Sequence, residues 1–347
     1  MITQFLDDLE SRINPKTEQK LQEDWTDFFT HGTGNGLFKP QRQTRSASEI
    51  EWPDISINDT LNDNEKMALH QYEVCSRQIA SGNGGPMNVR SNFGTGILSS
   101  LFGAELFIMP EETNTLPTTR ILKDGVSDIR KLVDAGVPDL NNGLGRQVFD
   151  MGEYYKDILK NYPRIQEFVQ VYHPDLQGPL DICELLWGSE MFLVMHDEPE
   201  LVHAMLNLIT ETYIQFLRKW FALFPPRPEI NAHWNMMYRG PVMLRNDSAM
   251  NLSPEMYAEF ALPYDQRIFD TFGGGGIHFC GRGDHYIERM CSMKGLTTIQ
   301  LSQPDYNDME KIYRNTVDKG IRLIGLQREE SERAEKARGL NGFVHSR

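Results

Sequence analysis

The stretch SPEMYAEFALPYDQRIFDTFGGGGIHFCG, residues 253–281, joins a helical pattern directly to a strand pattern. Ser253 followed by Pro254 is typical of a helix start, because a serine side chain caps free backbone amides and proline fits the first turn. After the helix, residues 274–281 have the pattern of a strand. A helix that leads straight into a strand is part of a repeating α/β unit.

The same alternation continues on both sides of this stretch. Downstream, we expect helices over 284–293 and 308–320, strands over 296–303 and 321–327, and then a helix-rich tail. Upstream, we expect strands over 85–93, 105–110, 168–175 and 229–237, and helices that begin at Asn62 and at Asp197. Repeated βα units predict a parallel sheet. No GxGxxG follows the first strand, which disfavours a dinucleotide-binding fold.

The predicted fold class is α/β, with a single (β/α)8 TIM barrel over residues 61–347 and a helical N-terminal extension over residues 1–60. Polar residues recur where the predicted strands end, and in such a barrel these positions form the mouth that holds the active site. They are His173, Asp175, Asn235, Cys280, Gln303 and Gln327.

The composition excludes several classes of protein. The 347 residues include 35 Lys and Arg against 49 Asp and Glu, a net charge of −14, which argues against binding to nucleic acid or to an anionic membrane. Four irregularly spaced cysteines are too few for a disulfide framework. The N-terminal residues lack the pattern of a signal peptide, and no apolar run approaches the length of a membrane span. We therefore expect a cytoplasmic protein with reduced thiols.

His278 and Cys280 are the first candidates for chemistry. Residues two apart in a strand point to the same face, so the imidazole and the thiol project together while Phe279 packs the other way. Imidazole nitrogen and thiolate sulfur are ligands that zinc prefers. The alternative is that His-x-Cys is an ordinary pair of strand residues. The glycines that flank the pair would let a bulky ligand approach the backbone.

Two further segments combine charged and polar side chains. Arg245, Asn246 and Asp247 precede the predicted helix cap, and a carboxylate beside an arginine can steer a proton or orient a ligand. Arg90 and Asn92 could present donors to a carboxylate or phosphate. The alternatives are a solvated loop with an internal ion pair and a structural turn. The remaining candidates for substrate binding are Gln177, His233 and Gln303.

Residues 253–281 and 296–312, with GPLDICELLWGSEMF at 178–192, resemble the uroporphyrinogen decarboxylase superfamily in the order of their blocks. The resemblance covers roughly residues 85–326 and implies a single (β/α)8 barrel. It implies one of two activities: decarboxylation of uroporphyrinogen without a cofactor, or methyl transfer that involves a corrinoid carried by a partner protein. In the methyltransferases a His-x-Cys pair and a later cysteine hold zinc, and His278 and Cys280 match that pair.

The sequence departs from both branches of this superfamily. Residues 321–347 contain no cysteine, and the arginine-rich block with Gly-Arg-Tyr that is found in the decarboxylases has no convincing counterpart here. The preferred hypothesis is zinc-dependent methyl transfer to a thiol or similar acceptor. His278 and Cys280 would hold Zn²⁺, with a carboxylate or water completing the shell, and Asp247 would order the acceptor or a ligand.

Two other functions stay open. In a tetrapyrrole decarboxylase, Asp247 would stabilise a protonated pyrrole while Arg90 and Arg245 hold carboxylates. In a non-catalytic protein, the barrel would bind a tetrapyrrole, a corrinoid or a small acid. The expected partners are a small-molecule substrate and a corrinoid protein. A homodimer is a further possibility.

Overall fold

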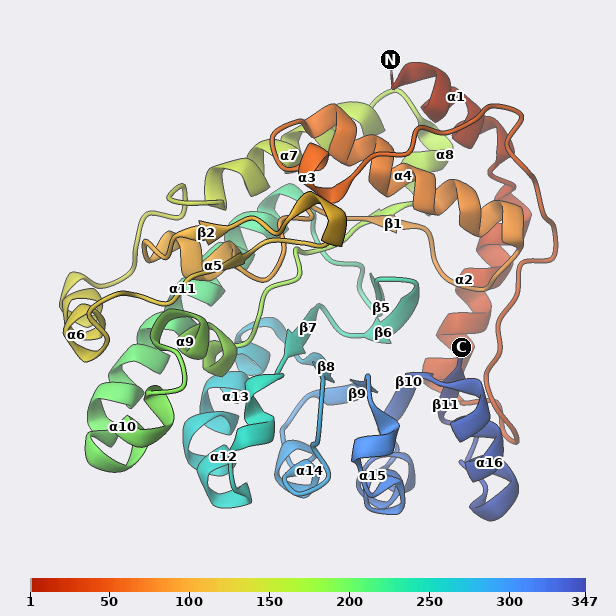
Figure 1. The fold of residues 1–347 in the computed structure, drawn as a ribbon. Helices are drawn as coiled ribbons and strands as arrows, with labels where there is room; N and C mark the ends of the chain where they lie inside the picture. Colours follow the sequence, from red (N-terminus) through yellow and green to blue (C-terminus); the bar gives the residue numbers. More distant parts are fainter. Residues whose placement is uncertain (1) are drawn as a thin grey trace.

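The computed structural model describes residues 2–347 as a mixed α/β fold (Figure 1). Its main sheet has five strands in the order β11–β10–β9–β8–β7, and every neighbouring pair is parallel. The strands are β7 (Val242–Arg245), β8 (Gly275–Phe279), β9 (Leu296–Leu301), β10 (Arg322–Leu326) and β11 (Val344–Ser346).

Helices connect the consecutive strands of this sheet and lie along its outer side (Figure 1). They are α12 (Pro254–Phe260), α13 (Leu262–Phe272), α14 (Ile287–Met290), α15 (Met309–Asn315) and α16 (Arg328–Arg338). The predicted alternation from residue 253 to residue 327 is therefore confirmed as parallel βα units.

Several predicted bounds in this half are wrong. The single helix expected over 253–272 is two helices that break at Ala261, because Pro263 lacks the amide hydrogen that would continue the first helix and its ring clashes with the carbonyl one turn earlier. The expected helix at 284–293 is reduced to α14, and the one at 308–320 ends as a 3-10 turn over Val317–Lys319. The strands β7 and β11 were not predicted.

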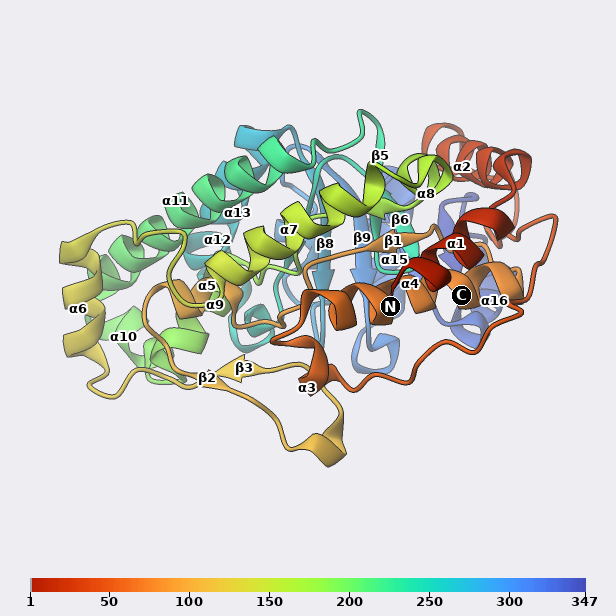
Figure 2. The ribbon, with the colours of Figure 1, turned by 90° about the horizontal axis from the view of Figure 1, so that it is seen from above.

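The upstream strands form three separate pairs. β1 (Asn88–Val89) pairs in parallel with β4 (Gln170–Val171). The segment 105–110 contains β2 (Leu106–Phe107), but β2 pairs antiparallel with β3 (Thr118–Thr119) in a hairpin that projects from the molecule (Figure 2). It is not the start of a parallel βα unit.

The strand expected over 229–237 is also a hairpin. β5 (Ile230–His233) turns at Trp234, which has a φ of 53°, and returns antiparallel as β6 (Met236–Arg239). β6 lies against β8, β9 and β10. Within residues 2–347 these pairs stay separate from the five-stranded sheet, so the hydrogen-bonded ladders do not trace a closed barrel.

Helices make up most of the remaining upstream chain. The helix expected from Asn62 is α4, which Asp63 caps and Gly82 ends, and the helix expected from Asp197 begins two residues later because Asp197 ends α10. The upstream helices are α4 (Asn64–Ser81), α5 (Ile97–Leu101), α6 (Val126–Ala135), α7 (Gly145–Leu159), α8 (Pro163–Phe168), α9 (Pro179–Trp187), α10 (Met191–Asp197) and α11 (Pro199–Leu223).

The first 60 residues contain α1 (Thr3–Arg12), α2 (Pro15–Thr30) and α3 (Ile57–Thr60). α1 packs against α4 and α8 and shares their hydrophobic core. α2 joins β6, β7 and β10 in a second core, and it lies beside the C-terminal strand (Figure 1). The domain boundary at residue 60 stays a prediction. None of the helices in residues 2–347 is long and apolar enough to cross a bilayer.

Candidate metal centre and adjoining cavity

Strand β8 carries His278, and its register against the neighbouring strands sets what the imidazole faces. In this register Arg245 of β7 and Gln300 of β9 lie on either side of His278. The glycines at the start of β8 allow this close pairing, since a Cβ atom on Gly275 would lie 1.8 Å from the Val242 carbonyl oxygen. These glycines thus allow close strand packing. Their contacts do not support the expectation that they leave room for a bulky ligand beside the backbone.

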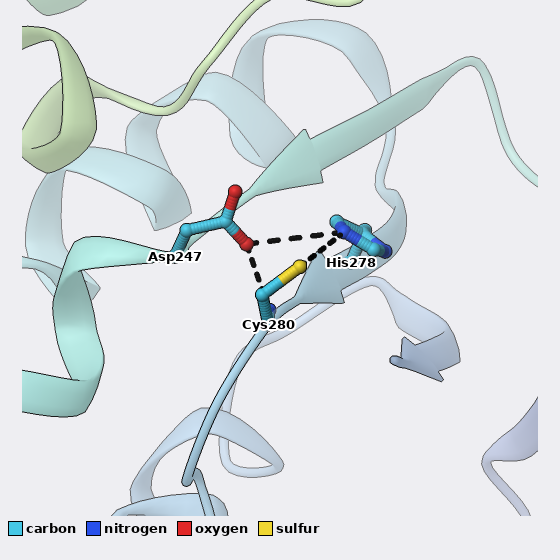
Figure 3. Close-up of side chains that lie close together, drawn as sticks. All are labelled: Asp247, His278 and Cys280. Carbon is cyan, nitrogen blue, oxygen red and sulfur yellow. Dashed lines mark hydrogen bonds and ion pairs between the residues drawn. The ribbon is translucent and has the colours of Figure 1, made fainter. Parts of the chain in front are cut away.

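Asp247, His278 and Cys280 converge just beyond the ends of β7 and β8 (Figure 3). One ligand atom from each lies within 4.8 Å of the others. The His278 Nε2 atom is 3.4 Å from the Cys280 Sγ atom and 3.8 Å from the Asp247 Oδ1 atom. Carboxylate oxygen, imidazole nitrogen and thiolate sulfur are all zinc ligands, so this set is a candidate metal centre.

Gln300 fixes the orientation of the His278 ring. The Gln300 Oε1 atom lies 2.6 Å from His278 Nδ1 and can only accept, which places the proton on Nδ1 and leaves the Nε2 lone pair directed at the cluster. Burial, together with the charge of Arg245, lowers the pKa of His278 and keeps the ring neutral. Histidines that bind metals have this second hydrogen bond as a rule.

Backbone amides hold the Asp247 carboxylate and the turn that carries it. The Cys280 amide donates to Asp247 Oδ1 at 2.7 Å. The buried carboxylate of Asp181 accepts from the amides of Asp247 at 2.9 Å and Ser248 at 2.8 Å, which fixes the turn that carries Asp247. Burial and the charge of Asp247 raise the pKa of the Cys280 thiol.

A buried ion-pair cluster lies beside the candidate metal centre. The Asp175 carboxylate pairs with Arg90 and, at 2.8 Å, with Arg245, and it accepts from the Trp234 indole at 2.9 Å. Burial alone would raise the pKa of Asp175, but the two arginines outweigh burial and lower it. Trp234 also packs against His278 with ring centroids 5.1 Å apart, so the β5–β6 turn connects this cluster to the candidate metal centre.

A cavity of about 350 Å³ adjoins the candidate metal centre at Asp247. It lies between helix α9, strand β3 and the 3-10 turn Ser248–Asn251, which follows Asp247. Its lining residues are Thr95, Thr119, Ile121, Gln177, Asp181, Glu184, Leu185, Gly188, Ser189, Asp247 and Ser248. Gln177 and Asp247 are the sequence-predicted residues that line it.

The structure gives other sequence-predicted residues internal partners. Asn92 accepts from the Arg90 guanidinium at 2.8 Å, and the Asn246 amide donates to buried Asp265 at 2.6 Å. Gln303 accepts from the Gly281 amide at 2.7 Å and fixes the loop after Cys280. His233 is buried against Trp234, and burial lowers its pKa. Their assignment to substrate binding stays a prediction.

Three further residues shape the site, and of these only Gln300 was not noticed in the sequence. Gln300 lies opposite His278 in the strand register, and aligning residues 296–303 with 274–281 as neighbouring parallel strands would have found it. Asp181 and Trp234 reach the site through a helix start and a hairpin turn. No local pattern in the sequence reports those two placements.

Comparisons with known proteins support the fold. No protein-family model and no curated protein sequence matches the chain. Among solved structures, the chain is similar to a methyltransferase from Methanosarcina mazei, with a TM-score of 0.59 and 13% sequence identity over 95% of this chain and 92% of that one. At this identity the likeness establishes a common fold along nearly the whole chain.

Proposed function

We propose that this protein is a zinc-dependent methyltransferase of the uroporphyrinogen decarboxylase superfamily, acting with a separate corrinoid protein and a thiol or similar acceptor. The observation that carries the proposal is the convergence of Asp247, His278 and Cys280 within 4.8 Å. The common fold with a methyltransferase supports it. We also propose that the strands belong to a (β/α)8 barrel, with the candidate metal centre at its mouth.

The donor set suits zinc in chemistry and in number. One thiolate, one imidazole and one carboxylate leave a fourth position open, which is typical of catalytic rather than structural zinc sites. The third ligand would be Asp247 in place of the later cysteine that the sequence lacks. When bound, zinc would lower the pKa of an acceptor thiol and present it as the thiolate.

The surrounding residues prepare these ligands. Burial keeps His278 neutral, and Gln300 holds its proton on the nitrogen away from the cluster. Asp247 is fixed on one side by Asp181 and on the other by the Cys280 amide. Because the pKa of Cys280 is raised, its thiol is protonated in the free protein, and metal binding should release a proton.

The decarboxylase reading is less well supported. It needs Arg90 and Arg245 to hold substrate carboxylates, but both guanidiniums are already paired with Asp175. A second carboxylate would have to compete with that buried pair. A non-catalytic binding protein would not need an oriented histidine beside a thiol and a carboxylate.

A methyl-transfer assay tests the proposal, with free methylcobalamin as donor and a simple thiol as acceptor. The zinc-loaded protein should consume methylcobalamin, and Cys280→Ser should lose roughly 100-fold or more in rate, since even an outer-shell change can cost about that much. Cys291→Ser is the matched control, because this half-buried thiol lies outside the cluster. Equal rates for wild type and Cys280→Ser, or turnover of a porphyrinogen instead, would overturn the proposal.

A further inference from the structure

Cys280 lies one residue beyond the end of β8, which stops at Phe279. The ladder between β8 and β9 ends at the same residue. The amide of Cys280 donates to Asp247 Oδ1, so one candidate ligand holds the backbone of another. The position of the thiol therefore depends on the loop that follows the strand, residues 280–284, as well as on the strand itself.

The Asn307 side chain, from the segment between β9 and α15, holds this loop. Its Oδ1 atom accepts from the amides of Gly283 at 2.7 Å and Asp284 at 3.0 Å. Its Nδ2 atom donates to the carbonyl oxygens of Gly281 at 3.0 Å and Gln303 at 2.8 Å. An asparagine side chain has two donor hydrogens and an oxygen that accepts two hydrogen bonds, so Asn307 uses its full capacity.

The orientation of the Asn307 amide follows from its surroundings. Two N–H groups lie at one end of it and two carbonyl oxygens at the other, so the reversed amide would face donors with donors and acceptors with acceptors. Gln303 adds a further bond, since its side-chain oxygen accepts from the Gly281 amide at 2.7 Å. Gly281 has a φ of 74°, which favours glycine. The neighbouring βα unit thus fixes a loop with an unusual backbone.

We propose that Asn307 is a positioning residue for Cys280: it holds the loop in the form that keeps the thiol at the candidate metal centre. The inference rests on the proposed function, in which Cys280 is a zinc ligand. A thiol on a loose loop would have to be ordered each time a metal binds, which costs free energy. Because Asn307 orders the loop when the protein folds, the thiol is in place before the metal arrives.

The first measurement uses metal-free protein, so that its result does not depend on zinc. In a Cys291→Ser background, Cys75 and Cys183 are buried and Cys280 is the reactive thiol. Asn307→Ala should raise the rate at which iodoacetamide alkylates Cys280 by about tenfold, because a loop without these hydrogen bonds opens more often.

Asn315→Ala is the matched control, since Asn315 is also half-buried and lies on the adjoining helix α15. Its side chain donates to the Lys311 carbonyl and accepts from Lys319, both outside the Cys280 loop. Alkylation of Cys280 should be unchanged in this variant. Asn307→Ser, whose shorter side chain cannot span both loops, replaces Asn307→Ala if that variant does not fold.

A second measurement adds cobalt(II) in place of zinc and follows the absorption band that a thiolate ligand produces. Asn307→Ala should bind cobalt about tenfold more weakly and with a weaker thiolate band, as expected when the partner of a ligand is lost. Alkylation and cobalt spectra equal to those of wild type in folded Asn307→Ala would overturn the inference and leave the metal proposal standing. Faster alkylation of Asn307→Ala in a protein that takes up neither cobalt nor zinc would uphold the inference and reject the metal proposal.

Discussion

Gln300 is the residue whose role follows most directly from strand register. Its side-chain oxygen holds the His278 ring from the opposite side to the cluster. Gln300→Leu should weaken zinc binding by about 10- to 100-fold, the usual effect of losing such a partner. Gln300→Glu keeps an acceptor and should retain most of the affinity. Chelator competition measures the dissociation constants, and equal values for Gln300→Leu and wild type would contradict this role.

Asp175 is the anion between two buried arginines. Asp175→Asn leaves Arg90 and Arg245 without their counter-charge, so the free energy of unfolding should fall by about 3–5 kcal/mol. Denaturant unfolding measures this change. Asp157→Asn is the control, because its pair with Lys160 is exposed and screened by solvent, so its loss should hardly change stability. Similar losses of unfolding free energy in the two variants would show that the buried ion pairs stabilise the protein no more than an exposed pair does.

At the scale of elements, β8 depends on the absence of a side chain at Gly275. A methyl group there would collide with the Val242 carbonyl, whereas at Gly273 no atom lies within 4 Å of the added carbon and the only cost is the strain of a φ of 95°. Gly275→Ala should therefore lower the free energy of unfolding by about 3 kcal/mol, near the top of the usual range for overpacking. Gly275→Ala should lower the free energy of unfolding by clearly more than Gly273→Ala does. Denaturation of both variants checks this order.

The elements also show where local patterns suffice. Helix and strand signals from 253 to 327 give the right order of elements, since each lies in a short window of sequence with its own caps and breaks. The β5–β6 hairpin was missed because its turn contains Trp234 and Asn235 without the glycine that usually marks such a turn. Trp234 tolerates a positive φ there while its ring packs against Arg245 and donates to Asp175.

The candidate site was predictable in the same limited way. Spacing of two in a strand correctly places His278 and Cys280 side by side, because that period is a property of the backbone. Asp247 joins them only through the pairing of β7 with β8. The partners of Arg90 and Arg245 depend on Asp175, which is distant in sequence from both, so no local pattern reveals that their charges are already paired.

At the scale of the whole molecule, His345 connects the two ends of the chain. It is buried against Trp25 and Phe38, and it accepts from the Gly325 amide. Burial lowers its pKa to about 3 from 6.5. Because the folded pKa lies below the unfolded one, the unfolded chain binds the extra proton, and stability is lost as the pH falls from about 6.5 toward 3.

This linkage predicts a slope that can be measured. His345 should contribute up to about 1.4 kcal/mol of unfolding free energy per pH unit in that window. His345→Gln retains an acceptor for the Gly325 amide but does not titrate, so its plot of stability against pH should be flatter by that amount. Urea denaturation at pH values from about 4 to about 7 measures and compares the two slopes. Parallel plots would mean that His345 is not buried as a neutral ring.

The central claim is that Asp247, His278 and Cys280 form one metal centre, and metal content tests it most directly. Protein purified without chelators should contain about one zinc per chain, since the cluster offers three of the ligands that a catalytic site uses. Cys280→Ala and Asp247→Ala should each lose the metal, while Cys291→Ala should keep it. Zinc-free wild type that also fails to take up added zinc, or zinc retained in Cys280→Ala, would contradict the account.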